Sequence, residues 1–296
     1  MTHHRAALAL ALAFLAHPLA AAPEAGPLVT PDWLVENGAD ENVVIVDIRD
    51  GTAEDGPFVP GAVLAPYGAA GWRTTLDGIP YEVPPRAQIS ALVRSLGIDD
   101  DDRVVIVPEG SSSTEFAGAT RVYWTLRHLG HDAISILDGG FRAYAAADAP
   151  LAQAPARPGE GDFFTDPNLA ILSTLDDVTA ALRGDTVLVD ARPEAQFAGR
   201  ETSRIVARAG TIPGARNLPH SALYDPEAMR FADADELRAL TEAAGIPLGG
   251  EMIAFCNTGH WGSIAWFALS EVLGQRVSLY DGSMAEWAAD PDRPVE

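Results

Sequence analysis

The stretch VVIVDIR at residues 43–49 decides the fold, because a closely similar stretch, VLVDAR, stands at residues 187–192. Two further motifs recur in the same order: VPGA (59–62) as IPGA (212–215), and DGG (138–140) as DGS (281–283). The second copy carries an insertion between Arg192 and Ile212. Three motifs repeated in order indicate an internal duplication of domain size.

A chain of 296 residues is long enough for two domains. Residues 145–161 are rich in Ala and Pro and show little periodicity, which predicts an exposed connector with the boundary near Ala156. We therefore place the first domain at residues 27–150, a linker at 151–165 and the second domain at 166–296.

Short β-branched runs alternate with helical patterns in both halves. This alternation predicts an α/β fold of two tandem domains, each a parallel sheet flanked by helices. The expected strands are 104–107, 134–137, 252–255 and 277–280, and the expected helices are 120–129 and 263–273. In such sheets ligands bind at the carboxyl ends of the strands.

The first 22 residues have the order of a secretory signal peptide. His3, His4 and Arg5 precede an apolar run at 6–16, and small residues follow at 20–22. The apolar run is too short to anchor the chain in a bilayer, although a buried N-terminal helix is the alternative. We expect an exported protein, which in a bacterial cell means the periplasm.

Charge excludes several kinds of partner. The chain has 20 Lys and Arg against 42 Asp and Glu, a formal net charge of −22, which repels nucleic acid and anionic lipid. An anionic substrate therefore needs local positive potential at its site. We expect a monomer with small-molecule substrates, no membrane contact after signal removal, and no metal or cofactor, because the histidines are scattered.

Cys256, the only cysteine, lies in the run IAFCNTGHWGS at residues 253–263. A buried strand precedes it, and a loop with Gly259 and Gly262 leads into a helix. Such a loop can turn its N–H groups inward, and the helix N-terminus adds partial positive charge. Together they favour a thiolate with a lowered pKa. The alternative is a buried structural cysteine.

The repeated Asp-x-Arg strand ends, the Pro-Gly-Ala motifs, the cysteine loop and the Asp-Gly turns resemble the rhodanese family. Two copies with cysteine only in the second resemble its two-domain sulfurtransferases. The resemblance implies that Cys256 takes the outer sulfur of a donor such as thiosulfate and that the persulfide passes it to cyanide or a thiol. It implies that loop N–H groups hold the charge, from Asn257, Thr258, Gly259, His260, Trp261, Gly262 and Ser263. Without a second cysteine, an external acceptor must discharge the persulfide.

The first half lacks this chemistry, because Pro108 stands roughly where Cys256 stands in the second half. The run from Ser111 to Thr114 could suggest a serine nucleophile, but we expect a solvated loop there. The first domain then serves to wall the cleft.

Donor specificity is the open question. Thiosulfate-specific members of the family carry basic residues in the loop, where this chain has only His260. Members specific for 3-mercaptopyruvate carry an arginine after the Asp-x-Arg strand, where this chain has Gln196. Arg200 or Arg204 could replace that arginine.

We expect ancillary roles for the remaining candidate residues. Arg192 is expected to pair with Asp190, and Asp190 to orient the loop. His260 is expected at the pocket mouth, and Trp261 to shield the persulfide from water.

The alternatives to a sulfurtransferase enzyme are a cysteine phosphatase and a non-catalytic sulfur carrier. A cysteine phosphatase needs an arginine near the loop end to clamp phosphate, and residues 260–264 contain none. A sulfur carrier that loads once for a partner protein stays open.

Overall fold

A computed structural model describes residues 22–51 and 56–296 and contains two five-stranded sheets with the same strand order. The first sheet runs β1 (Leu28–Val29), β7 (Ile134–Leu137), β6 (Arg103–Val107), β2 (Val43–Asp47) and β3 (Val63–Leu64). The second runs β8 (Leu172–Ser173), β14 (Arg276–Tyr280), β13 (Glu251–Phe255), β9 (Val187–Asp190) and β10 (Arg216–Asn217). All of these pairings are parallel, which confirms the predicted fold class.

The predicted signal peptide lies outside the described residues except for Ala22, and export stays a prediction. In the part of the chain that the structure describes, no helix combines the length and apolar character needed to cross a bilayer.

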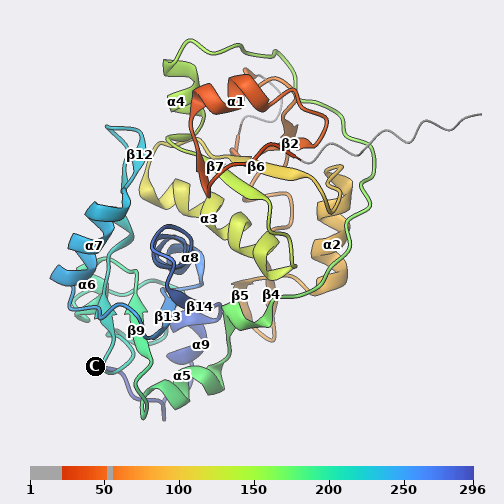
Figure 1. The fold of residues 1–296 in the computed structure, drawn as a ribbon. Coiled ribbons are helices and arrows are strands. Elements are labelled where there is room, and N and C mark those ends of the chain that lie inside the picture. Colours follow the sequence, from red (N-terminus) through yellow and green to blue (C-terminus); the bar gives the residue numbers. More distant parts are fainter. Residues whose placement is uncertain (1–21, 52–55) are drawn as a thin grey trace, which may run out of the picture.

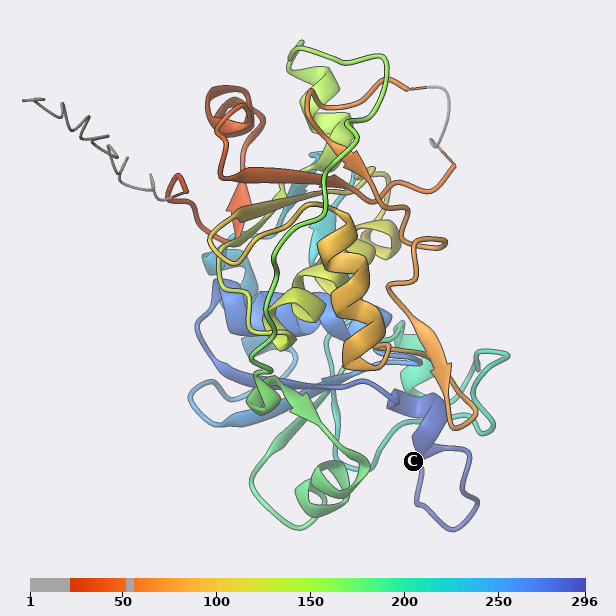
Figure 2. The ribbon, with the colours of Figure 1, turned by 90° about the vertical axis from the view of Figure 1, so that its right-hand side faces the viewer.

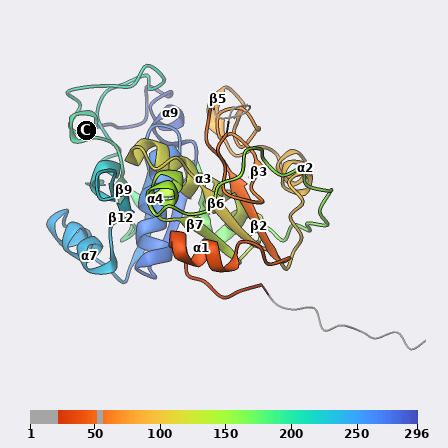
Figure 3. The ribbon, with the colours of Figure 1, turned by 90° about the horizontal axis from the view of Figure 1, so that it is seen from above.

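Helices cover both faces of each sheet (Figure 1). The outer face of the first sheet packs on α1 (Pro31–Asn37) and α4 (Gly140–Ala146), and its inner face on α2 (Arg86–Ser95) and α3 (Ser113–His128). The second sheet has α5 (Leu175–Ala181) and α9 (Ser283–Trp287) outside, with α7 (Ala234–Ala243) and α8 (His260–Phe267) inside. Seen from above, α2 and α7 lie at opposite edges of the molecule (Figure 3).

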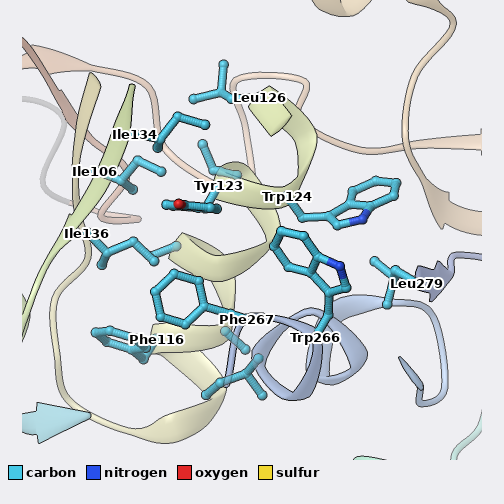
Figure 4. Packing of buried hydrophobic residues seen from close by; sticks show 14 of the residues in the cluster. Ile106, Phe116, Tyr123, Trp124, Leu126, Ile134, Ile136, Trp266, Phe267 and Leu279 are labelled. Carbon is cyan, nitrogen blue, oxygen red and sulfur yellow. The ribbon is translucent and has the colours of Figure 1, made fainter. Parts of the chain in front are cut away.

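The two inner faces share one hydrophobic core, with α3 and α8 side by side between the sheets (Figure 2). Figure 4 shows the rings that fill it, where Tyr123 meets Phe267 edge to face with centroids 5.0 Å apart. Small polar residues let α3 and α8 approach each other closely, as the distance of 2.9 Å between Thr120 Oγ1 and Ser263 Oγ shows. Because this buried packing of α3 on α8 is tight, it holds the loop that precedes α8 in place against the first domain.

Each domain also sends a hairpin to the other. Val83, beside the hairpin of β4 (Thr74–Leu76) and β5 (Ile79–Glu82), donates its N–H to Asp281 at 2.8 Å. Phe231, in the hairpin of β11 (Tyr224–Asp225) and β12 (Arg230–Phe231), donates to Asp138 at 2.7 Å. These equivalent contacts agree with the predicted duplication.

Two predicted elements differ in the structure. Helix α3 begins at Ser113 and not at residue 120, because the Ser112 hydroxyl accepts the Glu115 N–H at 3.1 Å and caps it. The loop expected at 111–114 therefore ends at Ser112, since Ser113 and Thr114 belong to α3; Ser113 is buried, whereas Thr114 is exposed as expected. The helix expected at 263–273 begins at His260 and continues from α8 into a π-helical segment, Ala268–Val272.

Candidate active site

Cys256 follows the last residue of β13 and is 1% exposed. Its backbone is held at both ends by the turn after β14. The Cys256 N–H donates to Ser283 Oγ at 3.1 Å, and its carbonyl accepts the Met284 N–H at 3.0 Å. Ser283 keeps φ at +51°, a left-handed conformation that is costly for a non-glycine residue. Sequence reasoning singled out the turn but missed this role of the serine.

The loop after Cys256 turns part of its backbone toward the sulfur. The Thr258 N–H donates to Sγ, with the nitrogen 3.4 Å from the sulfur, and the backbone N–H groups of Gly262 and Trp261 also act to lower the pKa of the thiol. The Gly259 N–H points elsewhere, to Ser283 Oγ at 2.9 Å. Three of the seven predicted loop residues therefore favour a negatively charged group at the sulfur, and Thr258 does so through a direct hydrogen bond.

The direction of the thiol pKa differs from the expectation. Burial raises the pKa of Cys256, the N–H groups of Thr258, Gly262 and Trp261 oppose the rise, and the Asp190 charge adds to it. The expectation of a lowered pKa considered the donors of the loop and not the loss of water around the sulfur.

Asp190 and Arg192 form the predicted ion pair, with Nη2 2.6 Å from Oδ2 and both side chains buried. Arg192 also donates to the Gly210 carbonyl at 2.8 Å, so the pair ties β9 to the insertion. In the β9–β13 pairing, Asp190 lies opposite Phe255, which is the residue directly before Cys256. The first domain repeats the pair at Asp47 and Arg49, also at 2.6 Å.

The structure brings Gln196, in α6 (Glu194–Phe197), to the cysteine loop. Its Oε1 accepts a hydrogen bond from Asn257 Nδ2 at 2.9 Å. Arg200 and Arg204 are both exposed, and the Arg200 guanidinium pairs with Glu194. A donor clamp at either arginine stays a prediction.

His260 is bound on both ring nitrogens by the first domain. Nε2 donates to the Thr114 carbonyl at 2.8 Å, which leaves Nδ1 to accept from the Tyr67 hydroxyl at 2.8 Å. Burial, together with the nearby charge of Arg73, lowers the pKa of His260 to about 3. His260 is therefore neutral at physiological pH and supplies no positive charge to the loop.

Trp261 is anchored in the same way. Its indole nitrogen donates to Thr114 Oγ1 at 3.2 Å, and its ring stacks on His220 with centroids 4.3 Å apart. His220 Nδ1 lies 3.0 Å from the Ser113 hydroxyl. The first turn of α3 thus holds the cysteine loop, a contact that no local sequence pattern indicates.

The equivalent loop of the first domain is filled by its own carboxylate. Glu115 accepts the N–H groups of Glu109 at 2.6 Å and Gly110 at 2.7 Å. Pro108 stands at the Cys256 position, since its carbonyl accepts the Phe141 N–H at 2.8 Å as Cys256 accepts that of Met284. The N–H groups of Glu109 and Gly110 are therefore not available to a substrate.

Within residues 22–51 and 56–296, no three or more His, Cys, Asp or Glu side chains are grouped so that they could hold a metal ion. The arrangement around Cys256 provides a nucleophile, N–H donors and a neighbouring first domain.

Comparisons with known proteins agree with this architecture. The family model of the rhodanese-like domain matches residues 30–147 and 174–290. The chain is 34% identical over 288 residues to a putative thiosulfate sulfurtransferase of Haloferax volcanii, covering 91% of this chain and 96% of the relative. It is 30% identical over 280 residues to the 3-mercaptopyruvate sulfurtransferase of Escherichia coli, covering 90% and 97%.

Solved structures show the same fold. The Escherichia coli protein SseA, described as a 3-mercaptopyruvate sulfotransferase, matches with a TM-score of 0.72 and 26% identity, over 88% of this chain and 99% of that one. The Tum1 protein of Saccharomyces cerevisiae matches with a TM-score of 0.77 and 23% identity, over 92% and 98%. The chain therefore belongs to the two-domain sulfurtransferases of the rhodanese family.

Proposed function

We propose that the protein moves a sulfane sulfur from thiosulfate to cyanide or a thiol through a persulfide on Cys256. The Cys256 thiolate attacks the outer sulfur of the donor, the S–S bond breaks, and sulfite leaves with the electron pair. The acceptor then attacks the outer persulfide sulfur, and the Cys256 thiolate leaves. The observation that carries the proposal is the sulfur directly after β13, which accepts the Thr258 N–H at 3.4 Å in a loop whose Gly262 and Trp261 N–H groups also favour the thiolate.

A second candidate donor is 3-mercaptopyruvate, because one relative at 30% identity bears that name. With that donor the Cys256 thiolate attacks the thiol sulfur, the C–S bond breaks with its electron pair on carbon, and the pyruvate enolate that leaves takes up a proton to give pyruvate. Comparing kcat/KM for the two donors with the purified protein separates these candidates. A sulfur carrier would be loaded once and stop, so sustained turnover with either donor would exclude it.

The persulfide should be observable directly. Treating the protein with thiosulfate should add one sulfur, about 32 Da, and cyanide should remove it. Intact-mass spectrometry before and after each step checks this, with peptide mapping to locate the added sulfur. An unchanged mass while thiosulfate is turned over would contradict a covalent intermediate on Cys256.

The pH dependence follows from the raised thiol pKa of Cys256. Only the thiolate attacks, and below the pKa its fraction rises about tenfold per pH unit. We therefore expect kcat/KM for thiosulfate to rise continuously from pH 7 to about 9. A plateau reached below about pH 8 would show that the loop donors outweigh burial.

Glu82 provides the control for this measurement. Burial, with the charges of Asp281 and Glu286, raises the pKa of Glu82 to about 7, so it also titrates in this range. The Glu82→Gln variant should keep the same rising profile. His260 and His220, with pKa values lowered by burial to about 3 and about 4, should contribute nothing above pH 6.

A further inference from the structure

A cavity of about 470 Å³ lies where the first domain meets the cysteine loop, and its wall includes Tyr67, Arg73 and Thr114 together with His260. Tyr67 joins the cavity to the loop through its hydrogen bond to His260. Burial raises the pKa of Tyr67 to about 12, and the Cys256 charge is among the smaller causes of that rise. His260, four residues after Cys256, thus brings the cysteine loop into the wall of this cavity.

Arg73 is held in the cavity wall by aromatic rings. Its Cζ lies 4.1 Å from the ring centroid of Tyr67 and 4.8 Å from that of Tyr81. Stacking engages the flat faces of a guanidinium and leaves the N–H donors at its edge available. Among residues 22–51 and 56–296, no carboxylate forms an ion pair with Arg73.

Tyr81 maintains this stacking with a strained backbone. Its φ is +68°, although its side chain is 45% exposed and gains little from burial. A left-handed conformation costs a non-glycine residue about 1–2 kcal/mol, and strain of this kind accompanies functional positions. In the β4–β5 hairpin, the strained residue places its ring against Arg73.

Three carboxylates also line the cavity, and each is bound elsewhere. Asp50 accepts the Gly68 N–H at 2.8 Å, and Glu109 lies 3.6 Å from the Arg49 guanidinium. Glu115 accepts the two N–H groups of its own loop. These carboxylates do not occupy the N–H donors of Arg73. Their negative charge opposes anion binding elsewhere in the cavity, so an anion is favoured only in direct contact with the Arg73 guanidinium.

We propose that Arg73 forms the subsite for the charged end of the sulfur donor, a small oxyanion such as the sulfonate of thiosulfate or a carboxylate. The donor would place its oxygens on the edge of Arg73 and its transferable sulfur toward Cys256, so the first domain contributes a binding residue as well as a wall. This assignment rests on the proposed sulfur transfer at Cys256.

Charge-selective alkylation tests the subsite without requiring turnover. The Cys256 thiolate displaces iodide from anionic iodoacetate or neutral iodoacetamide, forming a C–S bond in both cases, and mass spectrometry follows each rate. Arg73→Met should lower the ratio of the iodoacetate rate to the iodoacetamide rate about tenfold. The matched control is Arg86→Met, which removes the same charge from an exposed residue at the start of α2. It should leave the ratio unchanged.

Three further variants distinguish Arg73 from the other candidate arginines. Arg73→Lys should retain part of the ratio, since it keeps the charge and loses the planar edge. Arg200→Ala and Arg204→Ala test the alternative clamp that the sequence suggested, and a loss of the ratio in either with no loss in Arg73→Met would overturn the assignment.

Steady-state kinetics supply the second readout. Arg73→Met should raise KM for thiosulfate about tenfold with little change in kcat, because the site binds the donor before chemistry. Unchanged alkylation ratio and unchanged KM in Arg73→Met would refute the subsite. If the wild-type protein forms no persulfide with thiosulfate, the proposed function fails, whereas the alkylation ratio still decides whether Arg73 attracts anions.

Discussion

Cys256→Ser should reduce sulfur transfer by at least about a thousandfold, because a serine oxygen cannot hold a sulfane sulfur and is not ionised at working pH. The serine hydroxyl can still accept the Thr258 N–H, which lies 3.4 Å from Sγ in the structure. The loop therefore keeps a partner, and we expect the free energy of unfolding to change by no more than about 1 kcal/mol.

The measurement pairs steady-state turnover with urea unfolding of both proteins. Cys256→Ala is the matched variant: it should be equally inactive but less stable than Cys256→Ser, because it leaves the loop N–H groups without an acceptor at a site that is 1% exposed. Sulfur transfer retained in Cys256→Ser would exclude Cys256 as the sulfur-carrying atom.

The duplication and the setting of Cys256 could be predicted because both depend on local patterns. A β-branched run ending in Asp-x-Arg predicts the end of a strand, and a cysteine before a glycine-containing loop predicts a strand-to-helix turn. The Asp190–Arg192 pair could also be expected, since its two residues are only two positions apart at a strand end.

The contacts that hold the cysteine loop could not be predicted in the same way. Thr114 reaches His260 because α3 packs against α8 across the domain boundary, and Tyr67 reaches it from the loop between β3 and β4 of the first domain. Sequence periodicity identifies an apolar helix face but not its partner in another domain. Arg73 was missed for the same reason, because its position beside the loop follows from the hairpin and the domain contact.

The start of α3 had a sequence signal that was not used, whereas the direction of the thiol pKa needed the structure. Ser112 and Glu115 have the spacing of a helix start, which would have placed the beginning of α3 correctly. The direction of the thiol pKa depended on a balance between N–H donors and burial of Cys256, and only the structure gives the extent of burial.

Gly259→Ala should lower the free energy of unfolding and abolish sulfur transfer. Gly259 has φ of +73°, and a Cβ there would lie 2.6 Å from Asp281 Oδ1 and still closer to Arg121 Nη1. These two residues form a buried ion pair, with Nη2 2.5 Å from Oδ1, at the contact between the domains. The added methyl group must separate them, and disrupting a buried pair costs about 3–5 kcal/mol.

Gly274→Ala separates this clash from the cost of the backbone conformation alone. Gly274 has a similar φ of +66°, but nothing lies within 4 Å of a Cβ built there. It should therefore lose only the left-handed penalty of about 1–2 kcal/mol and keep its sulfur transfer. Urea unfolding and turnover of both variants provide the comparison. Equal losses of stability in the two variants would mean that Arg121 and Asp281 move aside for the methyl group at little cost. In that case the Arg121–Asp281 pair would not be what fixes Gly259 and the cysteine loop between the two domains.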